Sequence, residues 1–374
     1  MDKKDNTLNT IQDYGILNYH VLDGMADWVR VVDASGSILF ANKAMKENFG
    51  ENMVGKECYL IHEDKKRCSF CISNISIITG EIIQKEEIIG GKHYSVKSSP
   101  ITNGDGDIFA AVEVFRDVTR ERRLEIELIE RNKKMSKDLE FAKRIQERIL
   151  PRKGPLGVIN LDYIYKPSEM LSGDMFDVFH INDDNIGIYI SDVAGHGVAA
   201  SMMTMFIRQT MRVMKADIVS PSQTLTELHG RFALLNLDVD KYFTIFYGVL
   251  NTKTGLFRFA NGGHNCVPIR FNDNQSENME LLQISGFPIA LLGEEMYYDE
   301  KEIQLRKDDK ILFYTDGITE IKDKMGKEFG VDGVLNTIRN SSKNLLQEIE
   351  DNVITHNYGE QEDDYAVVLM QYTK

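Results

Sequence analysis

The segment from residue 116 to residue 153 most constrains how this chain can fold. It contains no glycine, no proline before Pro151 and many strong helix formers, so it predicts one long helix that ends at that proline. The net charge also changes here, from −5 in residues 1–115 to +5 in the segment itself and −14 in residues 154–374. A chain of 374 residues exceeds one ordinary globular core. We therefore expect one domain on each side of a helical linker.

The linker carries an apolar heptad pattern that is interrupted by Arg131 and Asp138. One interpretation is a surface helix packed on its own domain. The other is a parallel two-stranded coiled coil, kept weak by the two charged positions so that changes upstream can shift its register. The second interpretation predicts a homodimer in which residues 116–153 serve dimerisation and signalling. The seam positions are Leu124, Leu128, Arg131, Met135, Asp138, Ala142, Ile145 and Ile149.

The composition is that of a folded, acidic protein, with 58 acidic and 44 basic side chains and 42% hydrophobic residues. Such a surface repels phosphate backbones and anionic lipids, so we expect neither nucleic acid nor a membrane as partner. No apolar run approaches the roughly 20 residues that span a bilayer, and the first residues lack the apolar core of a signal peptide. Three of the four cysteines fall within fourteen residues, unlike an extracellular disulfide framework. These features predict a cytoplasmic location.

Residues 21–118 alternate short strands and helices. Two hairpins are predicted, around turns at residues 33–36 and 103–106, with helical stretches between them. The first hairpin with FANKAMKENFG, the segment GKECYLIH and the closing AAVEVFRDVTRERR resemble a PAS domain. The resemblance implies a sensory or dimerising module over residues 1–115, and it names no small-molecule ligand.

The same region holds Cys58, His62, Cys68 and Cys71, of which the last two form a C-x2-C pair. Four soft or borderline ligands suit tetrahedral zinc, and the closing spacing lets two thiolates reach one ion. Three interpretations stay open. They are zinc or iron–sulfur ligation, thiol redox sensing through Cys68 and Cys71, and purely structural thiols.

In residues 154–374, several aspartates lie at the ends of strongly apolar runs. A carboxylate placed where a buried strand meets a turn is costly to desolvate and is usually neutralised by a cation. Oxygen ligands without clustered His or Cys favour Mg²⁺ or Mn²⁺, and carboxylates from separate strands could hold two ions about 3.5–4 Å apart for displacement at phosphorus. A water bridging such ions has its pKa lowered toward about 7, so that hydroxide could hydrolyse a phosphate monoester directly. The aspartates are Asp174, Asp192, Asp316, Asp363 and Asp364.

Five sequence blocks in this segment occur in order and at sensible separations. They are Ser172-Gly173-Asp174-Met175-Phe176-Asp177, Asp192-Val193-Ala194-Gly195-His196-Gly197, Asn261-Gly262-Gly263-His264-Asn265, Tyr314-Thr315-Asp316-Gly317 and Asp363-Asp364. Together with AKRIQERILP in the linker, they resemble the metal-dependent PPM (protein phosphatase 2C-like) Ser/Thr phosphatases. The resemblance is strongest to the bacterial SpoIIE/RsbU branch, which dephosphorylates anti-sigma factor antagonists.

The resemblance implies a role for each matching residue. Asp192 would bridge both metal ions, and the carbonyl of Val193 would contact one of them. Asp316 and Asp363 would complete the first ion, and Asp174 would support the second directly or through water. The Arg with which the wider phosphatase 2C group grips phosphate has no convincing equivalent in this chain.

His196 lies in a Gly-His-Gly turn at the start of a predicted helix. It could protonate the leaving Ser or Thr oxygen, or it could simply cap the helix. It is counted with Asp192 and Asp316 as a catalytic candidate, whereas His264 is expected to be a structural residue at the rim of the site.

The sequence thus predicts an α/β (α+β) protein with a PAS-like sensor, a coiled-coil linker helix and an α-β-β-α sandwich of two antiparallel sheets. Helices are expected at residues 197–215, 221–236 and 333–356. The expected activity is Mn²⁺- or Mg²⁺-dependent hydrolysis of phosphoserine or phosphothreonine on a partner protein, which the resemblance identifies as a STAS-type anti-sigma factor antagonist. Two alternatives remain, a catalytically silent scaffold and a hydrolase of a small phosphorylated molecule.

Overall fold

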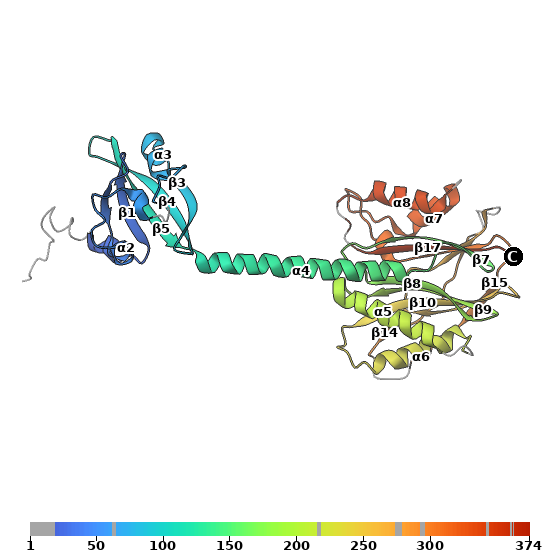
Figure 1. Cartoon of the computed structure of the whole chain (residues 1–374). Coiled ribbons are helices and arrows are strands. Elements are labelled where there is room, and N and C mark those ends of the chain that lie inside the picture. Colours follow the sequence, from blue (N-terminus) through green and yellow to red (C-terminus); the bar gives the residue numbers. More distant parts are fainter. Residues whose placement is uncertain are drawn as a thin grey trace, which may run out of the picture. The chain divides into compact units, whose positions relative to one another are not determined.

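The computed structural model describes residues 19–61, 65–214, 218–273, 279–291, 296–341, 344–359, 361 and 363–374. The chain divides into two compact units, Met1–Lys134 and Met135–Lys374 (Figure 1). Within the described ranges, no helix is both long enough and apolar enough to cross a membrane. The domain boundaries expected after residues 115 and 153 stay predictions, because the long helix α4 (Thr119–Ile149) contributes to both units.

The first unit is built on a five-stranded antiparallel sheet in the order β2-β1-β5-β4-β3. Both predicted hairpins are confirmed, because β1 pairs with β2 and β4 pairs with β5. Apolar side chains of the sheet pack against α2, η1 and α3 to form the core of this unit. The elements are β1 (Trp28–Asp33), β2 (Ile38–Ala41), α2 (Lys43–Phe49), η1 (Cys58–Ile61), α3 (Ile72–Thr79), β3 (Ile83–Ile89), β4 (Lys92–Thr102) and β5 (Ile108–Asp117).

The predicted linker helix is present as α4. Its seam residues Leu124, Leu128 and Met135 are exposed in the single chain, and pairing with a second copy stays a prediction. The C-terminal end of α4 joins the core of the second unit, where Gln146 is buried and Ile149 packs against apolar residues.

The second unit contains two six-stranded sheets. The first has the order β15-β11-β10-β9-β8, with β14 paired to β10, and the second has the order β13-β12-β16-β17-β7-β6. The first sheet is formed by β8 (Asp174–Asn182), β9 (Asn185–Val193), β10 (Tyr242–Asn251), β11 (Leu256–Gly262), β14 (Ile289–Ala290) and β15 (Lys301–Gln304). The second is formed by β6 (Gly154–Leu156), β7 (Ile159–Lys166), β12 (Ile269–Phe271), β13 (Glu280–Leu281), β16 (Lys310–Tyr314) and β17 (Tyr365–Tyr372).

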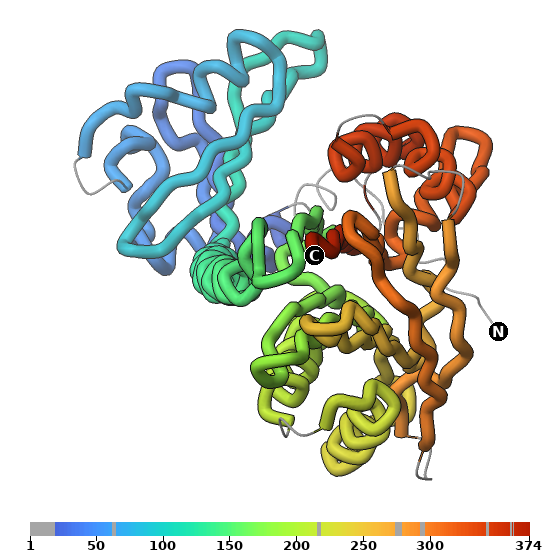
Figure 2. The backbone as a smooth tube through the Cα atoms, turned by 90° about the vertical axis from the view of Figure 1, so that its right-hand side faces the viewer, coloured from blue at the N-terminus to red at the C-terminus, as the bar shows by residue number. Residues whose placement is uncertain are grey.

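Helices cover the outer face of each sheet, as Figures 1 and 2 show. The central core, which includes Phe176 and Phe313, lies between the two sheets. A second core joins the first sheet to α5 (Gly197–Val213) and α6 (Pro221–Ala233). A third core joins the other sheet to α7 and α8. The predicted α-β-β-α sandwich is therefore confirmed.

The prediction of one helix over residues 333–356 is wrong. The structure has two helices there, α7 (Gly330–Asn340) and α8 (Leu345–His356). Ser341 takes an extended backbone conformation that ends α7, and the Asn344 side chain accepts a hydrogen bond from the backbone of the first turn of α8. A side chain that caps the new helix in this way favours a break over continuation.

Candidate active site

The β8–β9 hairpin places two of the predicted acidic residues opposite each other. Asp174 begins β8 and pairs in register with Asp192, near the end of β9. Opposite residues of an antiparallel pair project to the same face of the sheet. The largely buried side chains of both strands fix this register, so the two carboxylates share one side of the hairpin.

The second sheet brings two more aspartates to the same end of the sandwich. Asp316 begins the short helix η3 (Asp316–Ile318) directly after β16, and Asp363 lies just before β17. Since β16 and β17 are antiparallel neighbours, the end of one strand lies beside the start of the other.

Thr315 connects the two sheets at this point. Its hydroxyl accepts a hydrogen bond from the Ala366 backbone N–H at 2.8 Å, so its own proton is directed to Asp174, whose Oδ2 lies 2.7 Å away. Both side chains are buried. This bond fixes the Asp174 carboxylate against the second sheet, and it is a contact that the sequence analysis did not identify.

A cavity of about 430 Å³ opens where these strand ends meet. Asp192, Val193 and Asp363 line it, while Asp174 is buried and Asp316 is close enough to raise the pKa of Asp192. The structure therefore places Asp192, Val193 and Asp363 at one cavity, whereas Asp174 and Asp316 lie near Asp192 without lining the cavity.

The carboxylates at this cavity repel one another. Burial, and then the negative charges of Asp316 and Asp363, raise the pKa of Asp192 to about 7. Burial, and then the charge of Asp192, raise the pKa of Asp174 well above its usual range. Burial is also the main cause of the raised pKa values of Asp316 and Asp363. The raised pKa values show that negative charge at these carboxyl groups is not compensated by a nearby positive charge. Divalent cations can supply that positive charge by binding to the carboxylates.

Oxygen donors of this kind fit Mg²⁺ or Mn²⁺. Among the residues that the structure describes, no three His, Cys, Asp or Glu side chains already stand in an arrangement that would hold a metal ion. The carboxylates near the cavity therefore do not converge on one point. A bound cation would have to draw them together.

Glu320 is a further acidic residue at this cavity. Burial, and then the charge of Asp316, raise its pKa. Its backbone N–H donates to the Asp316 carbonyl at 2.9 Å, which places the two residues one helical turn apart. Glu320 was not predicted from the sequence, although the four-residue spacing in Asp-Gly-Ile-Thr-Glu places it about one helical turn after Asp316.

Two further aspartates of the sequence blocks form hydrogen bonds that stabilise the structure around the cavity. Asp364 accepts hydrogen bonds from the backbone N–H and hydroxyl of Ser168, at 2.6 and 2.9 Å, and from the backbone N–H of Gly173 at 2.7 Å. It thus fastens the loop that leads to Asp174. Asp177 is fully buried and accepts two hydrogen bonds from Arg212 of α5, at 2.5 and 2.9 Å.

His264 is buried and joins strand ends of both sheets. Its Nε2 lies 3.0 Å from the carbonyl oxygen of Tyr314, which can only accept, so Nε2 carries the proton and Nδ1 accepts from the Thr244 hydroxyl at 3.1 Å. Burial lowers its pKa to about 4, so the ring is neutral at pH 7. Thr244 pairs with Asp192 between β10 and β9. The hydrogen bond from Thr244 to His264 therefore helps to hold the strand next to Asp192 in place.

His196 lies at the rim of the cavity and occupies the position before the first residue of α5. Its side chain makes no capping hydrogen bond to that helix, and its Nδ1 lies 3.0 Å from a carboxylate oxygen of Glu169. The ring is largely exposed at the mouth of the cavity. Lys322 also lines the cavity and supplies a positive charge there.

Gln146 connects the linker helix to the loop that precedes Asp174. Its Nε2 donates to the Ser172 carbonyl at 2.8 Å, and its Oε1 accepts from the Ser172 backbone N–H at 3.0 Å. The side chain is 1% exposed. A glutamine at this position was not identified from the sequence, because its importance depends on a loop 26 residues away.

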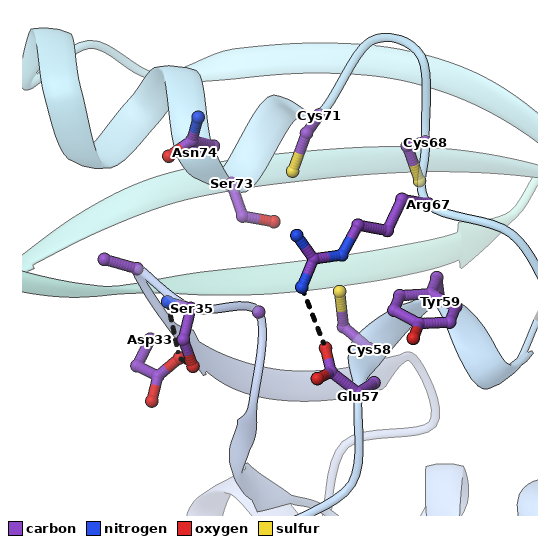
Figure 3. Close-up of a pocket in the computed structure, with 12 residues that line it drawn as sticks. Asp33, Ser35, Glu57, Cys58, Tyr59, Arg67, Cys68, Cys71, Ser73 and Asn74 are labelled. Carbon is purple, nitrogen blue, oxygen red and sulfur yellow. Dashed lines mark hydrogen bonds and ion pairs between the residues drawn. The ribbon is translucent and has the colours of Figure 1, made fainter.

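The cysteine cluster lies in the first unit, where a cavity of about 230 Å³ is lined by Cys58, Cys68 and Cys71 (Figure 3). None of the three forms a disulfide. Burial raises the pKa of the Cys58 thiol to about 11 and is also the main cause of the raised pKa of Cys68. His62, the fourth predicted ligand, lies outside the described residues. Cys266 is buried in the second unit.

Both parts of the chain match known families. Residues 26–120 match the PAS domain model, and residues 182–373 match the model described as stage II sporulation protein E (SpoIIE). The second range contains Asp192, Asp316 and Asp363 and begins after Asp174.

Two curated relatives come from Bacillus subtilis (strain 168). The chain is 29% identical over 192 residues to phosphoserine phosphatase RsbU, which covers 50% of this chain and 55% of that protein. It is 26% identical over 187 residues to phosphoserine phosphatase RsbP, which covers 49% of this chain and 45% of that protein. The chain thus spans about half the length of these relatives.

A solved structure shows the fold of the second unit. The SiaA-PP2C domain of Pseudomonas aeruginosa superposes with a TM-score of 0.55 and 21% sequence identity, covering 65% of this chain and 98% of that one. The predicted fold, a PAS domain followed by a phosphatase 2C-like sandwich, is therefore confirmed. Since the SpoIIE match extends over more than half of its residues, the chain belongs to the SpoIIE family and carries a PAS domain ahead of the family domain.

Proposed function

We propose that this protein is a metal-dependent phosphatase that removes phosphate from serine or threonine of a partner protein. The observation that carries the proposal is the group of acidic residues from both sheets around one cavity, where the pKa of Asp192 is raised to about 7. The names of the relatives RsbU and RsbP, both phosphoserine phosphatases, support the same activity.

Asp192 is the proposed bridge between two divalent ions, Mn²⁺ or Mg²⁺, with the Val193 carbonyl as a further ligand. Asp316 and Asp363 are the proposed remaining ligands of the first ion, and Asp174 supports the second. Held by these residues, such ions would supply a water of lowered pKa as the nucleophile and would neutralise charge on the phosphoryl group. The protein's contribution is to hold the carboxylates, and the Thr315 bond to Asp174 and the Asp364 bonds to the adjoining loop do this.

His196 is the proposed general acid. Its imidazole lies at the cavity mouth, and the nearby Glu169 carboxylate orients the ring through Nδ1. Nε2 is then the nitrogen from which a proton can pass to the leaving serine or threonine oxygen. Asp192 and Asp316 remain, with His196, the proposed catalytic residues.

The proposed substrate is a phosphorylated STAS-type anti-sigma factor antagonist in the cytoplasm. The proposed regulation runs from the PAS domain through a dimeric α4 to the phosphatase domain. The contact between Gln146 and Ser172 supports this route. It connects the linker helix to a residue only two positions before Asp174, a proposed metal ligand.

The test is release of phosphate from an aryl phosphate and from a phosphorylated STAS-type protein, with Mn²⁺ and after chelation. Wild type should be active only with the metal, and Asp192→Asn should lose at least about 100-fold in turnover, since metal-assisted charge stabilisation contributes several kcal/mol. Asp184→Asn is the matched control, because Asp184 lies at the far, turn end of the same hairpin and pairs with Lys253 at the surface. Equal activity of Asp192→Asn and Asp184→Asn would contradict the proposal.

A further inference from the structure

The cavity of the PAS domain contains an unusual set of donor atoms. Figure 3 shows the sulfur atoms of Cys58, Cys68 and Cys71 around the same cavity, contributed by η1, by the loop before α3 and by the residue at the start of α3. Glu57 lies on the same wall. Three cysteines and a glutamate thus line the same cavity.

The Glu57 carboxylate is incompletely satisfied. Its Oε2 is buried and has no hydrogen-bond partner among the residues that the structure describes. The positive charge recorded beside it is Arg67, whose Nη2 is 3.8 Å from Oε2, too far for a hydrogen bond. The Glu57 side chain as a whole is 41% exposed, but a bound cation would give this oxygen the partner that it lacks.

Gly36 lies beside two of the donor atoms. A Cβ placed on this residue would lie 3.6 Å from the sulfur of Cys58 and 3.7 Å from Oε2 of Glu57. Both donors therefore lie beside the same point. The backbone φ of Gly36 is 90°, a conformation that glycine adopts readily and other residues do not, so a side chain at this point is disfavoured.

A buried polar network holds the ligand-bearing segments in place. Arg30 donates to the Cys58 carbonyl at 2.6 Å and to the Glu113 carboxylate at 2.6 Å. The same Glu113 carboxylate accepts a hydrogen bond from Ser73, two residues after Cys71. Arg30, Glu113 and Ser73 are all buried. The network thus fixes the backbone of η1 relative to the start of α3, as the supporting residues of a metal site do.

We propose that the three cysteines, together with Glu57, form a binding site for a thiophilic divalent cation of the zinc class. Three sulfur ligands and one oxygen ligand complete the tetrahedral set that zinc prefers. The cation replaces Arg67 beside Glu57, and the protons of the three thiols pass to solvent when it binds. Because the ligands do not yet converge, binding requires them to move closer together, and Cys68 lies in a segment without regular secondary structure.

The experiment uses the full chain, reduced and cleared of metal by chelation, and titrates it with Co²⁺ and then Zn²⁺. Cobalt bound to thiolates gives a sulfur-to-metal charge-transfer absorption in the near ultraviolet, which the aspartate cavity of the other domain cannot produce. We expect this band to saturate at one equivalent and to disappear on addition of Zn²⁺. Glu57→Gln should weaken Co²⁺ binding while keeping the band, because all three sulfur ligands remain.

Cysteine variants locate the site. Cys58→Ser and Cys71→Ser should each lower the affinity by at least about tenfold, as loss of even a supporting residue commonly does. Cys266→Ser is the matched control, because it removes a buried cysteine from the other unit, and it should leave the titration unchanged. Ser73→Ala should weaken binding without abolishing the band.

Three results would overturn the proposal. One is the absence of a charge-transfer band in the folded, reduced wild-type chain, which depends on no variant. Another is a titration of Cys71→Ser that equals that of Cys266→Ser. The third is a disulfide between Cys68 and Cys71 that forms with a mild oxidant as readily in the presence of Zn²⁺ as in its absence, which would assign the cysteines to redox chemistry.

Discussion

Replacing Asp192 with asparagine should stabilise the chelated protein at neutral to alkaline pH, although it removes a proposed catalytic residue. The pKa of this carboxyl rises from its usual 3.8 to about 7, first through burial and then through the charges of Asp316 and Asp363. The unfolded chain ionises the group near its usual pKa, whereas the folded chain does so only near pH 7. The wild type therefore loses stability as the pH rises from about 4 through 7.

The size of the effect follows from the shift. About three pKa units correspond to about 4 kcal/mol at a pH above 7, since one unit is worth about 1.4 kcal/mol. That value is a ceiling, because part of the repulsion is shared with the neighbouring carboxylates. Asparagine keeps the shape of the side chain and removes its charge, so we expect a gain of about 2–4 kcal/mol.

The measurement is denaturant unfolding of the phosphatase domain within the full chain, at pH 5 and pH 8 in the presence of a chelator. The advantage of Asp192→Asn should be largest at pH 8 and should fall to less than half of that value at pH 5, because the unfolded carboxyl is already ionised there. Asp184→Asn should change stability by less than about 1 kcal/mol at both pH values, because its ion pair is at the surface. Mn²⁺ should stabilise the wild type more than the Asn variant. A variant that is less stable than wild type at pH 8, or an advantage that does not change with pH, would refute the reasoning.

Three further predictions follow from single contacts. Asp177→Asn should lower the free energy of unfolding by roughly 1–3 kcal/mol, and with it the melting temperature, because it weakens the buried hydrogen bonds with Arg212. The variant should retain Mn²⁺-dependent turnover, and a selective loss of turnover would show that Asp177 acts in catalysis. Gln146→Ala should uncouple the domains, so that removing residues 1–115 no longer changes phosphatase activity; an undiminished effect of the truncation would place the signalling contact elsewhere. Lys322→Ala should raise KM for a phosphorylated protein by about tenfold with little change in kcat, and Lys322→Arg should restore it; a fall in kcat alone would contradict a role in substrate binding.

The sequence was sufficient to predict those parts of the site that depend on one strand and its turn. Asp192 and Asp316 follow short apolar runs bounded by turn residues, which favour buried strands, and the structure places both residues where those strands end. The contacts of Thr315 with Asp174 and of Gln146 with Ser172 could not be predicted, because they depend on how segments distant in the sequence approach each other.

The cysteine cluster shows a similar division. The spacing of Cys58, His62, Cys68 and Cys71 left metal ligation, redox sensing and structural thiols open, and the structure places the three cysteines around one cavity. Glu57 was not distinguishable from a surface glutamate, since only the fold shows that its Oε2 is buried and has no hydrogen-bond partner within the described part of the chain. The division of residues 333–356 into two helices was missed for a local reason, because the capping of α8 by Asn344 competes with helix continuation.

The measurement that tests the central claim most directly combines Mn²⁺ binding with turnover on the same preparation. Equilibrium dialysis of the chelated protein counts bound Mn²⁺, and phosphate release from a phosphorylated STAS-type protein is then followed at each occupancy. We predict that activity rises with occupancy of the aspartate cavity and that Asp192→Asn loses both. Turnover that persists in chelated wild-type protein, or in Asp192→Asn without bound Mn²⁺, would contradict the account.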